Sequence, residues 1–200
     1  MIRHFTALGK SKFEKLSDET IFNNETEGFR LKCGKCPCSC CGAVGRLSYF
    51  SFYYRHLVSY GDGGVIEGCV CVIRFKCSSC KTTHALLPDI VTPYSPYSLR
   101  FKITVLIAYI TRNKRKMTVE KVCNHYGIAI STLYEWKKLL SKHKDLLLGE
   151  LMSRKKPPLA FLENLLESES LSDLLCGFFS RFGFSFMQNR PTVTTRTRPP

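Results

Sequence analysis

The sequence has no hydrophobic run long enough to cross a membrane. Its longest apolar stretch, residues 103–110, is interrupted by Thr104, whereas a membrane-spanning helix needs about 20 such residues. Residues 1–5 also lack the apolar core of a secretory leader. We therefore expect a soluble, cytoplasmic protein with no membrane partner.

Acidic residues are scarce, above all aspartate. The 200-residue chain has 16 Asp and Glu against 30 Lys and Arg, which gives a net charge of +14. The aspartates are Asp18, Asp62, Asp89, Asp145 and Asp173. A catalytic transposase needs clustered acidic side chains to hold two Mg²⁺ on a nuclease-like sheet, and these residues are scattered. We therefore expect that the chain is not an enzyme.

Cysteine, by contrast, is abundant. Eleven cysteines cannot all pair as disulfides, and in a reducing compartment such residues more often bind metal. Two Cys-x-x-Cys pairs, Cys38/Cys41 and Cys77/Cys80, have 35 residues between them. Two such pairs bring four thiolates to one tetrahedral Zn²⁺ and leave no open coordination position for hydrolysis. The spacing therefore predicts a structural zinc site.

The first pair has competitors. Five cysteines lie within nine residues: Cys33, Cys36, Cys38, Cys40 and Cys41. We prefer Cys38 and Cys41, because Gly42 follows them with the backbone freedom that a metal knuckle needs and the chain then runs directly into a strand. Replacement of one member by Cys36 or Cys33 remains an alternative.

The residues between the two pairs favour a β-hairpin. Residues 47–58 are rich in aromatic and β-branched side chains, residues 61–64 are a turn signal, and a second strand follows over about 65–75. We interpret residues 33–92 as a zinc ribbon, in which the metal stabilises a sheet too small for its own core. Cys69 and Cys71 are expected to be small buried hydrophobic residues, and His84 to be buried or hydrogen-bonded.

Helical patterns begin after a proline-punctuated connector. Ser98 is expected to cap a helix over residues 99–111. Residues 118–136 have the pattern of a helix-turn-helix, with Val119, Val122 and Tyr126 as the buried stripe of its first helix. The other positions expected at the turn or in the core are Cys123, Gly127, Ile128, Leu133 and Trp136. We assign residues 93–148 to an all-α DNA-binding domain, whose second helix Ser131 or Thr132 is expected to cap.

Positive charge is concentrated in this part of the chain. Residues 93–156 hold 14 basic and 4 acidic side chains, which is typical of phosphate binding. Positions expected to reach base edges in the major groove are Ser131, Thr132, Tyr134, Glu135 and Lys138. Cations expected to hold phosphates are Arg112, Lys114, Arg115, Lys116 and Lys137. We therefore predict binding to double-stranded DNA; the alternative is a helical hairpin used for protein contact.

The remaining segments complete an α+β architecture of a small zinc-ribbon hairpin domain followed by a helical domain. Residues 1–32 are expected to be an N-terminal arm, and residues 149–188 to form C-terminal helices that cover the helical core. A self-association surface is the alternative for those helices. Residues 189–200, rich in Thr, Arg and Pro, are expected to be a disordered tail.

Several strings together resemble a known bacterial family. They are Cys38-x-x-Cys41-Gly42, Tyr54-Arg55, Ile73-Arg74-Phe75-Lys76-Cys77-x-x-Cys80, Thr83-His84-Ala85-Leu86-Leu87-Pro88 and Pro93-Tyr94-Ser95-x-Tyr97-Ser98. Over about residues 36–140 the chain resembles the domain-of-unknown-function family 6431, whose members look like the zinc-ribbon and helix-turn-helix front ends of insertion-sequence transposases. The resemblance implies zinc ligation by Cys38, Cys41, Cys77 and Cys80, and it brings no assigned activity.

These observations favour a zinc-binding, DNA-binding protein of the transposase-associated type. We expect it to be linked to a mobile element and to act as an accessory or regulatory factor. The alternatives are a protein-interaction adaptor that uses the ribbon and helices to recruit a partner, and the DNA-binding part of a split transposase. A transposase or a second copy of the chain are the further partners considered.

Overall fold

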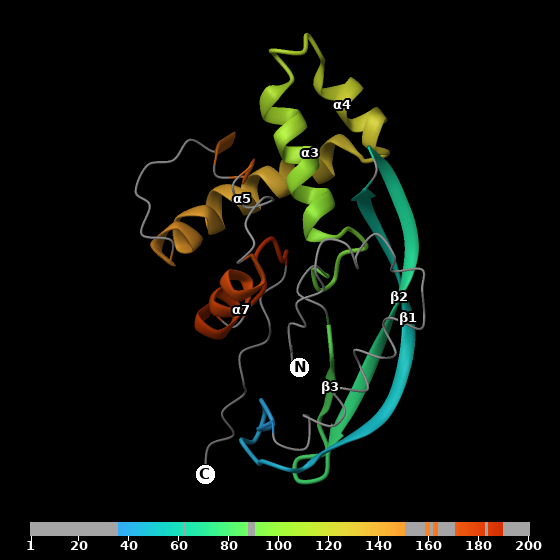
Figure 1. Cartoon of the computed structure of the whole chain (residues 1–200), viewed down its shortest axis with the longest axis vertical. Coiled ribbons are helices and arrows are strands. Elements are labelled where there is room, and N and C mark those ends of the chain that lie inside the picture. The colour runs from blue at the N-terminus through green and yellow to red at the C-terminus, as the bar shows by residue number, and fades with distance from the viewer. Residues whose placement is uncertain are drawn as a thin grey trace. The chain divides into compact units, whose positions relative to one another are not determined.

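The computed structural model describes residues 36–61, 63–87, 91–150, 159–160, 162–163, 171–182 and 184–189. Its named elements are β1 (Leu47–Gly61), β2 (Gly64–Cys77), β3 (Thr83–Ala85), α3 (Leu99–Thr111), α4 (Val119–Tyr126), α5 (Ile130–Glu150) and α7 (Leu171–Phe182). A three-stranded antiparallel sheet thus precedes the helices, which confirms the expected α+β class (Figure 1). The expected arm, Cys33 and the tail beyond Asn189 lie outside the described residues.

The chain forms two compact units. Among the described residues, the sheet unit comprises residues 36–57, 67–87 and 91, and the helical unit comprises 58–61, 63–66 and everything described from Thr92 onward. The end of the β1–β2 hairpin therefore belongs with the helices. Within the helical unit, the backbone N–H of Val58 donates to Pro96 O at 2.8 Å, and Ser98 N–H donates to Val58 O at 2.9 Å.

The strands are longer than the sequence predicts. β1 has 15 residues and β2 has 14, because the turn between them is tight and Gly63, at φ +78°, supplies its left-handed backbone. The sequence also did not predict β3. This three-residue strand pairs with β2 in the register Phe75↔His84, so its existence depends on a partner strand rather than on its own composition.

The core of the sheet unit lies mostly along β2 and the segment after β3. Its buried members are Cys38, Leu47, Leu57, Val70, Val72, Ile73, Phe75, Cys77, Leu86, Leu87 and Val91. The expectation that Cys69 is buried is wrong, because this core reaches along β2 only from Val70 onward and Cys69 is exposed. Cys71 is half-buried and packs against the core.

The helical unit is built on α3, α4 and α5, which contact one another (Figure 1). The expected α3 is confirmed in both its bounds and its cap, since Ser98 Oγ accepts from Phe101 N–H at 3.0 Å. α4 begins after the cap Thr118, whose Oγ1 accepts from Lys121 N–H at 3.2 Å, and ends at Gly127 with φ +63°. Of the predicted stripe of α4, Val122 and Tyr126 are buried and Val119 is partly buried against the same core, and the glycine at the turn is as predicted.

The start of α5 differs from the prediction. The helix already includes Ile130, and Leu133 N–H donates to Ala129 O at 3.2 Å, so neither Ser131 nor Thr132 is its cap. Ile128 is buried immediately before the helix, and this anchor sets where the helix begins although Ala129 offers no capping side chain.

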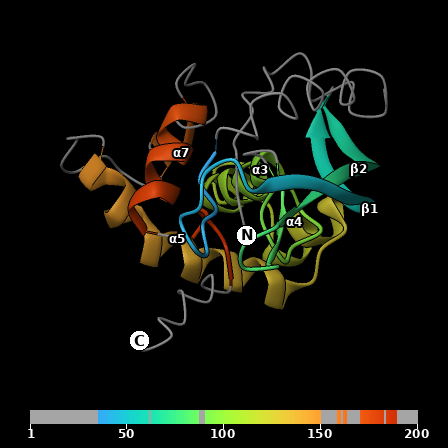
Figure 2. The same ribbon diagram turned by 90° about the horizontal axis from the view of Figure 1, so that it is seen from below.

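The C-terminal segment adds to the helical core. α7 lies alongside α5 (Figure 2), and Phe178 of α7 is fully buried. Beyond α7, the Met187 carbonyl accepts from Nζ of the buried Lys102 on α3 at 3.1 Å. No helix in the described part of the chain is long and apolar enough to cross a membrane.

Candidate metal centre and basic surface

Four cysteine sulfurs come together where the two knuckles meet. The Sγ atoms of Cys38, Cys41, Cys77 and Cys80 all lie within 4.8 Å of one another. Cys38 Sγ is 3.7 Å from Cys80 Sγ, and Cys41 Sγ is 3.8 Å from Cys77 Sγ. Sulfurs bound to one tetrahedral zinc at about 2.3 Å are about 3.8 Å apart, so the spacing of these atoms fits a Cys₄ zinc site.

The two knuckles repeat one backbone pattern. In the first, Gly42 N–H donates to Cys38 O at 2.8 Å, and Cys38 N–H donates to Ala43 O at 2.9 Å. In the second, Lys81 N–H donates to Cys77 O and Cys77 N–H donates to Thr82 O, both at 3.0 Å. Each turn therefore directs two sulfurs to the same side of the chain.

Both knuckles also require positive φ at the residue after the second cysteine. Gly42 has φ +73° and Lys81 has φ +60°. A side chain in this region costs about 1–2 kcal/mol, so the second knuckle tolerates a strain that the first avoids. The glycine was visible in the sequence, whereas nothing marked Lys81.

The two competing cysteines that the structure describes, Cys36 and Cys40, lie outside the group of four. Cys36 is half-buried against the sheet core. Cys40 is exposed, and its sulfur accepts a hydrogen bond from Thr82 Oγ1 at 3.5 Å. Among the cysteines of the first cluster that the structure describes, Cys38 and Cys41 are thus the two that join Cys77 and Cys80.

The four thiols differ in acidity. Hydrogen bonds from the Thr82 side chain and backbone lower the pKa of Cys80 to about 6. The Ala43 backbone N–H favours the Cys41 thiolate, but desolvation and the neighbouring sulfurs outweigh it and raise the pKa of Cys41 to about 12. Burial raises the pKa of Cys38, whereas the backbone N–H of Cys80 lowers that of Cys77. Four thiolates in one place therefore need a cation, and binding one would release protons.

His84 supports the cluster from outside it. The side chain is fully buried, with Nε2 3.2 Å from Cys38 Sγ and Nδ1 3.4 Å from Ser39 Oγ. Burial lowers the pKa of His84 to about 4, so the imidazole is neutral near pH 7. The expected buried, hydrogen-bonded histidine is confirmed, and contacts of this kind orient metal ligands in other proteins.

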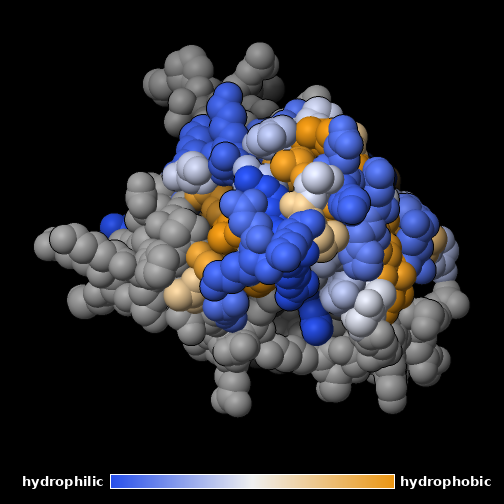
Figure 3. Space-filling view, turned by 90° about the horizontal axis from the view of Figure 1, so that it is seen from above, coloured by the Kyte–Doolittle hydropathy of each residue, from blue (hydrophilic) through white to orange (hydrophobic). Residues whose placement is uncertain are grey.

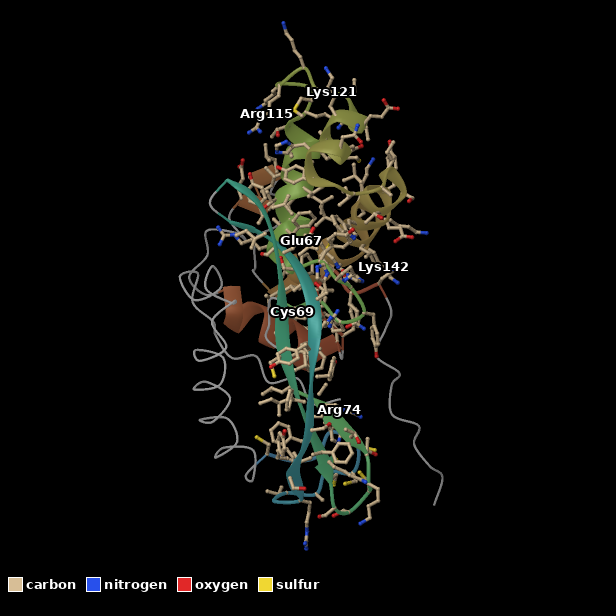
Figure 4. The ribbon with its side chains drawn as sticks, turned by 90° about the vertical axis from the view of Figure 1, so that its right-hand side faces the viewer. Glu67, Cys69, Arg74, Arg115, Lys121 and Lys142 are labelled. Carbon is tan, nitrogen blue, oxygen red and sulfur yellow. The ribbon has the colours of Figure 1, made fainter. Side chains whose placement is uncertain are left out.

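The predicted phosphate-binding cations lie mainly in the connection between α3 and α4. Lys114, Arg115 and Lys116 are exposed there. Figure 3 views this end of the helical unit directly, and hydrophilic side chains gather on it. Figure 4 shows Arg115 and Lys121 at the same end. Lys121, on α4 and exposed, is a further cation of this surface that was not among the predicted phosphate-binding residues.

Two of the predicted cations are held by an aromatic cluster. Arg112 is half-buried, donates from Nη1 to Tyr109 O at 2.7 Å, and has its guanidinium 4.2 Å from the Tyr109 ring centroid. Lys137 Nζ lies 5.5 Å from the same ring and 5.9 Å from the Tyr134 ring. Tyr109 thus connects the end of α3 to α5.

The predicted base-reading positions lie in the first three turns of α5. Ser131, Tyr134, Glu135 and Lys138 are exposed and Thr132 is half-buried. Tyr134 has 47% of its surface exposed. Glu135 Oε2 accepts from Asn189 Nδ2 at 3.5 Å, so one acidic group of this face has a partner within the chain.

The comparisons with known proteins give a family. No curated protein and no solved structure matches the chain. A family model described as a domain of unknown function (DUF6431) matches residues 36–136, which include the four clustered cysteines, the sheet, α3 and α4. The chain therefore belongs to the DUF6431 family.

Proposed function

We propose that this protein binds zinc through its four clustered cysteines and binds double-stranded DNA through its helical unit. Its role is accessory or regulatory and of the transposase-associated type, without catalysis by this chain. The observation that carries the proposal is the α4–turn–α5 hairpin. Its inner face is buried, and its outer face and the neighbouring α3–α4 connection carry exposed cations. The resemblance of the family to transposase front ends supports the link to a mobile element.

The α4–α5 hairpin has the features that a helix-turn-helix requires. Val122, Leu133 and Trp136 are buried in the core of the helical unit, and Cys123 of α4 is a small residue at 1% exposure in the same core. Gly127 adopts the left-handed conformation at the turn. Packing fixes this face of α5 inward, so its opposite face remains for a ligand.

That outward face would read the duplex. Ser131, Thr132, Tyr134 and Lys138 would approach base edges from the start of α5 in the major groove. Lys114, Arg115 and Lys116 would contact phosphates from the α3–α4 connection, and Arg112 and Lys137 would do so from the aromatic cluster. The excess of basic over acidic residues in this region supplies the attraction that is not sequence-specific.

Zinc has a structural part in this proposal. Cys38, Cys41, Cys77 and Cys80 would hold it, and four thiolates leave no position for a substrate. The metal would fix both knuckles to the sheet. Since the sheet core is small, metal binding would contribute directly to its folding.

Duplex binding is tested with a charge-matched pair of variants. Lys114→Ala with Arg115→Ala removes two proposed phosphate contacts, whereas Lys142→Ala with Arg181→Ala removes the same charge from exposed positions on α5 and α7. A duplex selected from a random pool would be titrated by fluorescence anisotropy at several salt concentrations. We expect the first variant to lower the slope of log affinity against log salt by about 0.9 per lost contact.

The control variant should leave that slope unchanged. Equal effects of the two variants would show that net charge alone acts and would contradict the placement of the site. Absence of salt-dependent duplex binding by the unaltered protein would contradict the function itself. Tight binding to a protein partner with little salt dependence would instead favour the adaptor.

A further inference from the structure

One face of β1 in the sheet unit carries a row of exposed aromatic rings. Phe50, Phe52 and Tyr54 are 48%, 53% and 55% exposed. They occupy alternate positions of one strand, so their side chains leave the same face. The rings of Phe52 and Tyr54 meet edge to face with centroids 5.7 Å apart. Contiguous aromatic surface of this kind is uncommon on proteins unless it binds something.

Two cations from β2 lie on the same face. The guanidinium of Arg74 is 5.5 Å and Nζ of Lys76 is 5.2 Å from the Phe50 ring centroid, and Figure 4 labels Arg74 on that strand. The basic residues of the described sheet unit are Arg46, Arg55, Arg74, Lys76 and Lys81, against Glu67 as its acidic residue. Glu67 is paired with His56 at 3.3 Å. The aromatic face is therefore also a cationic one.

We propose that this face binds single-stranded nucleic acid. Bases would stack on Phe50, Phe52 and Tyr54, while Arg74 and Lys76 would contact the phosphates between them. A single strand supplies both exposed ring faces and anions. An apolar protein surface would take the two cations out of water without offering them an acceptor, which is unfavourable.

The site is distinct from the proposed duplex surface. It lies in the sheet unit and shares no residue with α4, α5 or the α3–α4 connection. In a duplex the bases stack on each other and their faces are hidden, so rings such as Phe52 have nothing to stack on. The protein would therefore hold single and double strands through different residues.

The test uses the full-length, zinc-loaded protein and a fluorescein-labelled oligothymidylate, followed by anisotropy. Phe50→Ala with Phe52→Ala should weaken binding at least about tenfold, because each ring provides one stacking contact. The matched control is Tyr49→Ala with Tyr53→Ala. These rings are 45% and 41% exposed on the same strand, and they leave its opposite face. The control should bind like the unaltered protein.

A second variant probes the cations without touching the rings. Arg74→Gln with Lys76→Gln should flatten the salt dependence of oligothymidylate binding by about 0.7 per lost phosphate contact. This variant also decides the matter if the Phe50 and Phe52 changes reduce the zinc content.

Three results would overturn the proposal. The first is a lack of oligothymidylate binding by the unaltered protein, and the second is equal affinity of the two aromatic variants. In the third, the Phe50 and Phe52 changes abolish self-association in sedimentation while oligothymidylate affinity stays the same, which would assign this face to contact between protein chains.

Discussion

Different interactions stabilise the interior of the sheet unit and the interior of the helical unit. In the sheet unit, two of the buried core residues, Cys38 and Cys77, also belong to the sulfur cluster. In the helical unit, the core is larger and centres on aromatic packing, with Phe101 stacked on Tyr97 at 5.3 Å and edge-on to Trp136 at 6.1 Å. If the four sulfurs bind the proposed zinc, the sheet unit depends on a metal and the helical unit on apolar burial, so the two should respond to different perturbations.

Removal of the proposed metal should produce the largest difference between the responses of the two units. Cys77→Ser with Cys80→Ser deletes two of the four sulfurs, and the binding free energy of a structural zinc ion, about 10–16 kcal/mol, is folding free energy. We expect zinc content to fall from about one per chain to none. Hydrogen exchange should become fast in β2 and β3 while α3 and α4 stay protected.

Cys69→Ser provides the control, because Cys69 is exposed on β2 and outside the group of four. Its zinc content and exchange pattern should equal those of the unaltered protein. Full zinc content in the double variant would contradict the metal site, and simultaneous loss of protection in α3 would contradict the independence of the two units.

A smaller effect should appear when acid is used to perturb the helical unit. His143 is buried at 3% exposure, and its Nδ1 has no hydrogen-bond partner among the described residues. Its ring lies 5.0 Å from that of Phe184. Burial lowers the pKa of His143 to about 4, from 6.5. The unfolded chain binds a proton at this histidine at a higher pH than the folded chain does. The contribution of neutral His143 to the free energy of unfolding is therefore fully present above pH 6.5 and is lost as the pH drops from 6.5 towards 4.

The fluorescence of Trp136 isolates this effect, since it is the one tryptophan in the chain and lies in the helical core. Urea midpoints followed by this signal should decrease between pH 7 and pH 5. His143→Leu should remove most of that decrease. An unchanged pH dependence in this variant would mean that other groups destabilise the helical unit in acid.

The smallest expected effects come from one glycine in each unit. Gly42 in the first knuckle and Gly127 between α4 and α5 have φ of +73° and +63°, and an added Cβ would meet no atom within 4 Å at either. Alanine should therefore cost about 1–2 kcal/mol through backbone strain alone. Gly42→Ala should weaken zinc binding without moving the Trp136 unfolding midpoint. Gly127→Ala should do the reverse, and an effect of either change in both assays would show that the units are coupled.

The sequence predicted those parts of the fold that are marked locally. Ser98 and Gly127 signal helix ends through their own chemistry, and the hydrophobic spacing of α3 and α4 identifies their buried faces. The spacing of Cys38, Cys41, Cys77 and Cys80 likewise anticipated which sulfurs come together.

The features that were not predicted depend on residues distant in the chain. β3 forms only against β2, and the partial burial of Cys71 and the exposure of Cys69 depend on how far the sheet core extends. The start of α5 follows from the burial of Ile128 rather than from a capping side chain. The contacts of Tyr109 with Arg112 and Lys137 join the end of α3 to a helix that begins 21 residues after Tyr109, which no local pattern indicates.

The end of the β1–β2 hairpin is part of the helical unit, so it limits where a truncated fragment of the protein can begin. Neither unit is one uninterrupted length of polypeptide, since the chain leaves the sheet unit after Leu57, returns at Glu67 and leaves again after Val91. A fragment starting at Thr92 would contain α3, α4, α5 and α7 but would lack Val58, the backbone partner of Pro96 and of the fully buried Ser98. An orphaned buried amide is costly, so the smallest autonomous piece that preserves α4 and α5 should begin upstream of β1.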